Sequence, residues 1–365
     1  MIQEENLREL VEFDGQNYPV LSLYLNVDPR QRSTEKYRLA LRRLFATAPE
    51  ADPADIQRIE QYIDLEYDRQ ARGIVCFSCQ KKDFWRVYTF EVPVDDTIMI
   101  DRRPLVRRLV DLIDTYGYLG VVAVDRLGAR FFSFHLGVLE EATGTVGEDV
   151  KRHKQGGWSA SRYQRHEDEA AMSNLRLAAE LTEEYARQYH WRHLVLAGTD
   201  GNVAQFKEML PKSIQSLVVG STPLSLTASP QEIRERTEAI ALNAHHDYNQ
   251  RLASRLLVAA AKNANAVVGL EPTLDALQSG RVYQLLFTEN YNVDEGLVQR
   301  CLDCNYLSLS DDGVCPLCGG ATEAIPDAIN TIARRAIIQD ALVTVLPPDN
   351  PLVAEGQYLG AYLRY

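Results

Sequence analysis

The sequence has no long hydrophobic run and too little positive charge to balance its acids. No uninterrupted apolar stretch reaches the ~18–20 residues that a membrane helix needs, so we expect no membrane partner. The first ten residues, MIQEENLREL, contain no apolar h-region, and we therefore expect no signal peptide. Lysine and arginine number 39 against 51 aspartates and glutamates, which gives a net charge of −12. That charge argues against a protein that sheathes nucleic acid over a broad surface, so any contact with a polyanion must be local.

Cysteine is sparse and is not distributed as a disulfide framework would require. The six cysteines form three CxxC pairs, a usage that fits the reducing cytoplasm, where we expect the protein to act. The first pair, Cys76 and Cys79, lies in a β-like run that points the two thiols to opposite faces, so we expect both in the core. The 365 residues, 45% of them hydrophobic, can build two or three cores of ordinary size. We find no internal repeat, and we predict three domains, at residues 1–116, 117–228 and 229–365.

Hydrophobic periodicity predicts a mixed α/β fold along the whole chain. Strands are predicted at residues 20–27, 73–79, 84–92, 120–124, 129–134, 193–197, 216–220, 281–287, 341–346 and 359–364. Helices are predicted at residues 35–46, 53–63, 104–116, 171–189, 272–278 and 325–339, with one more that ends near Leu210. A capping box, Ser229-x-x-Glu232, starts a helical region that reaches about Ala264. It is longer than a typical globular helix, so we expect it to bend or to bridge the second and third sections.

Residues 151–166, KRHKQGGWSASRYQRH, depart most sharply from the acidic background. The stretch holds five lysines and arginines and no carboxylate, and acidic residues flank it on both sides. Gly156 and Gly157 allow φ > 0 and a close approach to a partner, and Trp158 offers a flat ring on which a base could stack. We predict a loop that inserts into a confined polyanion, nucleic acid above all; an ordinary solvated loop is the alternative. The residues predicted to bind RNA are Lys151, Arg152, Lys154, Trp158, Arg162 and Arg165.

The composition of this loop predicts whether it is ordered in the free protein. Its glycines and clustered positive charges make local order expensive without a polyanion. We therefore expect the loop to be mobile in the free protein and to become ordered on RNA.

Two further CxxC pairs, separated by ten residues, are the strongest chemical signal in the chain. Two such knuckles can place four thiolates tetrahedrally around Zn²⁺, and Pro316 with Gly319-Gly320 supplies the tight turn that the second knuckle needs. Four sulfur ligands leave no coordination position for water, so the predicted zinc is structural; four unrelated buried cysteines are the alternative. The predicted ligands are Cys301, Cys304, Cys315 and Cys318.

The order of elements and several motifs resemble the archaeal and eukaryotic class-1 peptide-release-factor family, with Pelota, and especially its divergent bacterial branch. The segment at 156–165, GGWSASRYQR, resembles the family's GGQ loop (GGQSxxRFxR) at both glycines, the serine, both arginines and the aromatic. In the first section, SLYL at 22–25 and GIVCF at 73–77 are similar in outline. In the third section, ALQSGRV at 276–282, the inserted zinc minidomain (301–320) and GAYLRY at 360–365 are similar. The resemblance covers nearly the whole chain.

The resemblance implies a three-domain architecture with an RNase-H-like middle domain and an L7Ae-like C-terminal domain that carries the zinc minidomain. It also implies a ribosome-associated tRNA mimic in translation, with rRNA and tRNA as partners, a translational GTPase as a candidate partner and no DNA. Two departures from the family matter. Its catalytic glutamine is Trp158 here, and the first section has no NIKS-type tetrapeptide, so we expect no stop-codon decoding. Tryptophan offers no side-chain amide to position water, although the backbone N–H at 158 can still stabilise an oxyanion.

These departures leave three hypotheses. The one that we favour is a ribosome-associated factor for hibernation or surveillance, with weak or no hydrolysis. The second is a peptidyl-tRNA hydrolase in ribosome rescue, with Gly156, Gly157 and Trp158 as the candidate catalytic loop tip.

The third hypothesis is an RNA-binding or RNA-processing protein that acts away from ribosomes. A two-metal nuclease would need a carboxylate cluster, and only Asp125 and Asp200 near strand ends suggest themselves. His245 and His246 lie mid-helix, where we expect a solvated pair.

Overall fold

The structure is a computed structural model that describes residues 4–126, 128–146, 160–294, 296–309 and 312–365. For residues 4, 141–146 and 160–168 it describes the backbone only. The chain divides into two compact units: unit 1 is Met1–Asp114 with His246–Tyr365, and unit 2 is Thr115–His245. Both units combine sheets and helices, which confirms the predicted mixed α/β fold class; the division into three domains stays a prediction. Among the described residues, no helix combines the length and the apolar character needed to cross a membrane.

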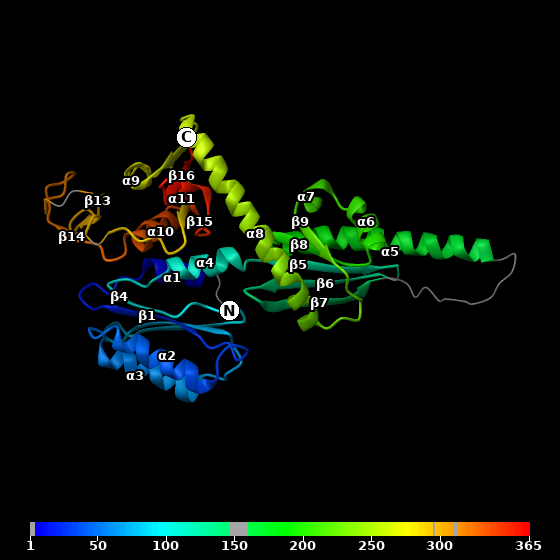
Figure 1. Ribbon diagram of the computed structural model, residues 1–365, viewed down its shortest axis with the longest axis horizontal. Coiled ribbons are helices and arrows are strands. Elements are labelled where there is room, and N and C mark those ends of the chain that lie inside the picture. The colour runs from blue at the N-terminus through cyan, green and yellow to red at the C-terminus, as the bar shows by residue number, and fades with distance from the viewer. Residues whose placement is uncertain (1–3, 127, 147–159, 295, 310–311) are drawn as a thin grey trace. The chain divides into compact units, whose positions relative to one another are not determined.

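The first half of unit 1 is an antiparallel sheet in the order β3-β2-β1-β4, with helices on both faces. Helices α2 and α3 cover one face (Figure 1), because the alternating Leu21, Leu23 and Leu25 point into the core beneath them. On the other face the Tyr24 hydroxyl donates a hydrogen bond to the Leu105 carbonyl oxygen at 2.5 Å. The strands are β1 (Val20–Asn26), β2 (Gly73–Cys79), β3 (Phe84–Phe90) and β4 (Thr97–Asp101). The helices are α1 (Glu4–Glu12), α2 (Thr34–Ala46), α3 (Pro53–Gln61) and α4 (Arg107–Thr115), with a π-helix at Tyr62–Glu66 and a 3₁₀ turn at Gln80–Lys82.

The second half of unit 1 is a mixed sheet in the order β10-β16-β11-β15, in which only β11 and β15 are parallel. Its strands are β10 (Ala266–Val268), β11 (Val282–Thr288), β15 (Leu342–Leu346) and β16 (Leu359–Leu363). Its helices are α9 (Leu270–Gln278), α10 (Ala328–Ile338) and α11 (Pro351–Ala354). Between β11 and α10 the chain forms the small sheet β13-β12-β14, from β12 (Gln299–Cys301), β13 (Leu307–Ser308) and β14 (Thr322–Ala324). This small sheet carries the second and third CxxC pairs and forms the predicted minidomain.

Buried polar contacts join the two halves of unit 1. The side-chain oxygen of Asn330 in α10 accepts hydrogen bonds from the backbone N–H groups of Val106 at 2.9 Å and Arg107 at 3.1 Å. One turn further along, Arg334 donates to the backbone carbonyls that end α1, those of Leu10, Val11 and Phe13. Helix ends leave such backbone groups without partners inside the helix. Helix α10 therefore completes both α4 and α1.

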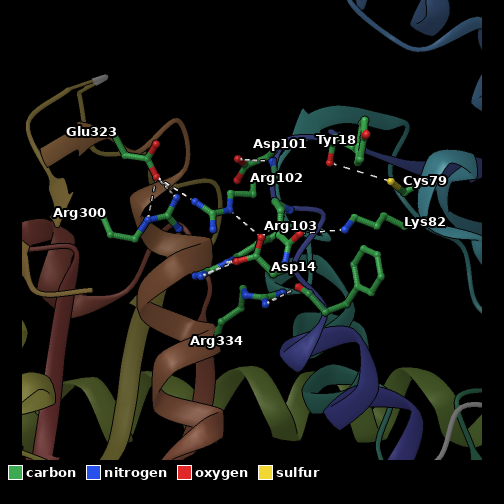
Figure 2. Close-up of polar contacts among 12 residues, drawn as sticks. Asp14, Tyr18, Cys79, Lys82, Asp101, Arg102, Arg103, Arg300, Glu323 and Arg334 are labelled. Atoms are coloured by element: carbon green, nitrogen blue, oxygen red, sulfur yellow. Dashed lines mark hydrogen bonds and ion pairs between the residues drawn. The ribbon is translucent and has the colours of Figure 1, made fainter. Parts of the chain in front are cut away.

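A second set of contacts ties the minidomain to the first half of unit 1. Figure 2 shows Arg102 between two carboxylates, with its Nε 2.6 Å from Asp14 Oδ1 and its Nη1 3.4 Å from Glu323 Oε1. Arg300 of β12 also donates to Glu323 of β14, from Nε at 3.1 Å. The base of the minidomain is thus held by paired charges.

Unit 2 is built on the sheet β7-β6-β5-β8-β9, in which β5, β8 and β9 are parallel and β5, β6 and β7 antiparallel. This order and these strand directions are those of an RNase-H-like sheet, as the family resemblance implies. Leu175 and Phe206, from the helices α5 and α6, pack against Val122 and Leu196 on one face. The strands are β5 (Leu119–Asp125), β6 (Gly128–His135), β7 (Val138–Val146), β8 (His193–Gly198) and β9 (Val218–Thr222). The helices are α5 (Ala160–Gln188), α6 (Asp200–Met209) and α7 (Lys212–Gln215).

Most of the predicted elements are present, with shifts of a few residues at their ends, but some predictions need correction. Helix α5 begins at Ala160, so residues 160–166, which we predicted as loop, are helical. The segments α1, β4, β7 and β10 were not predicted, because they are short or carry several polar residues. Helix α8 (Pro230–Ala261) is continuous, and its residues are shared between the two units. This agrees with the expected bridge between the second and third sections.

Candidate metal centre and nucleic-acid interface

The minidomain brings its four cysteines together. Their Sγ atoms all lie within 4.8 Å of one another, and no other group of three or more metal-ligating side chains occurs among the described residues. The Sγ–Sγ distances are 3.5 Å for Cys301–Cys318, 3.7 Å for Cys304–Cys315 and 3.4 Å for Cys304–Cys318. Sulfurs bound tetrahedrally at ~2.3 Å from zinc would lie about 3.8 Å apart. The four thiols therefore fit an ion of this size and softness.

The backbone of the two knuckles orients these thiols. The N–H of Cys304 points at the Cys301 sulfur at 3.5 Å, and the N–H of Leu317 points at the Cys315 sulfur at 3.4 Å. The Cys304 N–H is the largest cause that lowers the pKa of the Cys301 thiol, to about 7, because it stabilises the thiolate. Gly319 closes the second knuckle with φ at +77°, which only glycine adopts without strain, and donates to the Cys315 carbonyl at 2.9 Å. The predicted tight turn is confirmed.

The remaining pair, Cys76 and Cys79, is separate from this cluster. Both thiols are buried in β2, and burial raises the pKa of each. The expectation that they belong to the core is confirmed.

The predicted RNA-binding segment connects β7 to α5 in unit 2. Its predicted tip (Gly156, Gly157 and Trp158) and the basic residues Lys151, Arg152 and Lys154 lie outside the described residues. Arg162 and Arg165 lie in the first two turns of α5, where the backbone is described. The structure therefore fixes where the segment leaves and rejoins the fold.

Helix α5 extends beyond the sheet on which it packs. Figure 1 shows its first turns projecting past the edge of the sheet of unit 2. Ala171 is the first buried side chain among those described in this helix, eleven residues after Ala160. At ~1.5 Å per residue, Ala160, which lies within the basic segment, is about 16 Å along the helix axis from Ala171. A basic segment on a projecting arm can reach into a confined site.

A second basic surface, not predicted from the sequence, lies on α2 in unit 1. An open depression of about 530 Å³ is lined by Arg32, Lys36, Leu39, Arg43 and other residues of this region. Lys36, Leu39 and Arg43 are exposed and spaced at three and four residues, so they share one helix face. Arg32 is paired with Asp96 at 2.5 Å, whereas the side chains of Lys36 and Arg43 make no ion pair with the described residues. The helical spacing of these cations was the signal that could have found this surface.

The alternative of a carboxylate-based nuclease gains no support from the described residues. Asp125 ends β5 and Asp200 begins α6 after β8, and these strands are parallel neighbours, so the two residues follow adjacent strand ends. No third ligand joins them among the described side chains. Two turn aspartates are therefore the better interpretation.

The two histidines of α8 differ from the expected solvated pair. His245 is half-buried, with its ring centroid 6.1 Å from that of His193. His246 is also half-buried and lies 3.7 Å from Asp349. Both histidines therefore contact residues of neighbouring elements instead of being fully solvated.

The RNase-H-like sheet and the segment that connects β7 to α5 both lie in unit 2, and this part of the chain matches a family model. Residues 104–242 match the family described as bacterial archaeo-eukaryotic release factor family 10. The resemblance predicted from the sequence is confirmed for this region. No curated protein matches the sequence.

Several solved structures of translation termination factors and Pelota proteins align with most of this chain. The archaeal translation termination factor aRF1 is 16% identical over 100% of this chain and 99% of its own, with a TM-score of 0.28. Pelota from Archaeoglobus fulgidus is 12% identical over 82% of this chain and 81% of its own, with a TM-score of 0.35. Dom34 from S. cerevisiae, a translation termination-like factor involved in RNA quality control, is 11% identical over 82% and 83%, with a TM-score of 0.38. Likenesses at this level assign no function to this chain.

Proposed function

We propose that this protein is a ribosome-associated translation factor of the release-factor and Pelota type, which acts in the cytoplasm and binds in or near a ribosomal tRNA site. The observation that carries the proposal is the segment at 151–166, five basic residues around Gly156-Gly157 in a chain of net charge −12. The segment lies within the region that matches the family, and α5 projects beyond the sheet at its end. A local cation cluster on an acidic protein suits a narrow cavity walled by RNA, because the net charge of −12 disfavours contact with phosphate over a broad surface.

We propose further that peptidyl-tRNA hydrolysis is weak or absent, so the protein serves in ribosome hibernation or surveillance. Ester hydrolysis needs a water aligned with the carbonyl carbon and donors aimed at the developing oxyanion. Trp158 stands where the family has glutamine, and its indole is an apolar platform with a single N–H donor. Such a ring is suited to stacking on a base, an interaction worth about 1–3 kcal/mol. The segment is therefore better suited to binding RNA than to hydrolysing an ester.

The basic depression on α2 supports a second RNA contact. Lys36 and Arg43 flank Leu39 on one exposed helix face, and neither cation is neutralised by a described acid. Phosphates attract such unpaired cations, and each contact contributes to a salt-dependent affinity. Each unit thus has one set of cations that can contribute to RNA binding.

In this proposal zinc serves the fold and takes no part in chemistry. One Zn²⁺ would be held by Cys301, Cys304, Cys315 and Cys318. The ion would cross-link the two turns, which have little hydrophobic core of their own. A translational GTPase is a candidate partner in delivery to the ribosome.

Co-sedimentation with 70S ribosomes tests the proposal. We expect the protein to migrate with the ribosome at low salt, with deacylated tRNA changing the bound fraction by competition for the same site. Migration only at the top of the gradient, with and without tRNA, would contradict it and favour an RNA-binding role away from ribosomes.

The alternative function is a peptidyl-tRNA hydrolase in ribosome rescue. It is favoured by the backbone N–H of residue 158, which the tryptophan retains and which can stabilise an oxyanion. Gly156, Gly157 and Trp158 would then form the catalytic tip. Release of peptide from stalled ribosomes by the wild-type protein, at the rate of a GGQ-bearing factor, would establish this alternative.

A further inference from the structure

The zinc minidomain carries an apolar strip on an exposed face of its small sheet. The pairing of Cys301 with Thr322, continued by one residue, sets Leu302 opposite Ala321, and the Leu302 N–H donates to the Ala321 oxygen at 2.9 Å. Ala321 also pairs with Val314 on its other side. Residues directly opposite one another in an antiparallel sheet place their side chains on the same face. Leu302, Ala321 and Val314 therefore form one row across three chain segments.

This row is exposed in the folded protein. Leu302 and Val314 retain 53% and 54% of their accessible surface, and Leu317, in the adjoining knuckle, retains 68%. The neighbouring pair Cys301–Thr322 points to the opposite face, and Cys301 is buried there, within 4.8 Å of the other three thiols. The aliphatic side chains are thus not needed to bury the metal cluster. Exposed aliphatic residues gathered on a rigid turn structure are typical of a contact site for a protein partner.

The charges around this strip exclude RNA and indicate the chemistry of the partner. Residues 294–324 contain six acidic residues and a single basic one, Arg300. Arg300 is already paired with Glu323 at the base of the minidomain, and Arg102 also faces that carboxylate (Figure 2). Asp303 and Asp312 are exposed in the same two turns as Leu302 and Val314. A polyanion would be repelled here, whereas a cationic segment would be attracted.

We propose that this face of the minidomain, defined by the row of Leu302, Ala321 and Val314, docks a lysine- or arginine-rich protein segment that also presents an apolar side chain. The apolar row supplies buried area and the acidic rim selects for positive charge, a division found in protein interfaces generally. The site belongs to unit 1, whereas the segment at 151–166 belongs to unit 2, and the two have opposite charges. The site therefore contacts protein, whichever RNA the rest of the molecule binds.

Fluorescence anisotropy with labelled peptides tests this site directly. The probe is a peptide of alternating leucine and arginine, compared with alternating alanine and arginine, alternating leucine and glutamate, and poly(U). We expect the leucine–arginine peptide to bind about tenfold more tightly than the alanine–arginine peptide, since partial burial of one leucine side chain is worth about that factor. The leucine–glutamate peptide and poly(U) should not compete.

Variants assign the binding to this face. Leu302→Ser combined with Val314→Ser should weaken the leucine–arginine peptide about tenfold while zinc content stays near one per chain. Leu65→Ser, at a side chain 78% exposed elsewhere in unit 1, is the matched control and should have no effect. Equal affinity for the alanine–arginine peptide, displacement by poly(U), or indifference to the double variant would each overturn the proposal. Concentration-dependent self-association that the double variant abolishes, without peptide binding, would assign the strip to a second copy of the chain instead.

Discussion

Arg107 and Asp327 are 220 positions apart in the sequence, yet the Nε of the arginine donates to Oδ2 of the aspartate at 2.7 Å. Both side chains are buried, with 9% and 4% of their surface exposed. Asp327 also caps α10 by accepting from the Asn330 N–H at 2.8 Å, and Asn330 in turn receives the first N–H groups of α4. One ion pair therefore links the start of α4 to the start of α10.

We predict that this ion pair is required for the stability of unit 1. Asp327→Ala should lower the free energy of unfolding by about 3–5 kcal/mol, because it leaves a buried guanidinium without its counter-charge. Urea unfolding followed by circular dichroism measures the change. Arg8→Leu is the control: its ion pair with Asp340 is exposed at 59% and 73%, so its loss should cost less than about 1 kcal/mol. An equal decrease in the free energy of unfolding for the two variants would show that the buried Asp327 ion pair stabilises unit 1 no more than an exposed one.

Acid should destabilise unit 2 through His193. Burial, His245 and Arg192 together lower its pKa to about 4. The unfolded chain binds a proton at this histidine below pH ~6.5, whereas the folded chain does not until about pH 4. The free energy of unfolding should therefore fall as the pH drops from about 6.5 to about 4, and this contribution should be absent above pH 6.5.

The variant His193→Asn isolates this effect. Hydrogen exchange of β8 in urea, measured at pH 7 and pH 5, should show a smaller acid-induced loss of stability in the variant. His135 remains and has a pKa that burial also lowers to about 4, so the loss should shrink and not vanish. An unchanged difference between the two pH values would mean that His193 titrates normally in the fold.

Zinc removal should unfold the minidomain locally. We expect about one zinc per chain, and a chelator should raise the exchange rates of β12 and β14 while β1 and β11 stay protected, since the metal organises only the two knuckles. Cys304→Ser should reproduce the effect, whereas Cys76→Ala should keep its zinc because Cys76 lies in β2. Purified protein with no zinc and four freely titratable minidomain thiols would refute the site.

Charge reversal in the basic segment should weaken ribosome binding and its salt dependence. Arg162→Glu with Arg165→Glu should lower the slope of log affinity against log salt by about two, if each arginine neutralises one phosphate. Arg176→Glu with Arg187→Glu is the matched control, since both arginines are exposed on the same helix nearer its C-terminus. Identical slopes for the two double variants would exclude the segment as the contact.

Trp158→Gln should create or raise peptide release if the segment still fits the catalytic centre. Wild-type protein should release little peptide from stalled ribosomes, and the glutamine variant about 10²-fold more, the effect of one aligned donor in such sites. Trp158→Ala separates the two changes, because it removes the indole without adding an amide. If the alanine variant gains as much as the glutamine variant, the bulk of the ring, and not the missing amide, limits the wild-type protein.

The features that the sequence predicts well are those set by nearby residues. The two knuckles depend on CxxC spacing and on Gly319, and the strands β1 and β2 depend on short stretches rich in apolar residues. These patterns act within a few positions, so they survive without knowledge of the tertiary structure. The start of α5 was placed too late, because its first turns are polar and lack the apolar periodicity on which the prediction relied.

What could not be predicted depends on pairs far apart in the chain. No residue close to Arg107 in the sequence indicates that it pairs with Asp327. Likewise, no residue close to Arg334 indicates that it donates to the last backbone carbonyls of α1. The apolar row of Leu302 and Val314 also needs the register of three short segments, which local patterns do not specify. Such relationships emerge only when the sheets are assembled.

The interrupted layout of unit 1 has a consequence for biosynthesis. Residues 1–114 leave the ribosome long before residues 246–365, while the intervening Thr115–His245 is a compact unit with a core of its own. During synthesis at about 5–20 residues per second, the inserted unit can finish folding while the N-terminal sheet still waits for α10. Throughout that interval Arg107 has no counter-charge and the end of α1 has no cap. The nascent chain should therefore pass through a stage in which its middle is native and its first segment is exposed to chaperones and proteases.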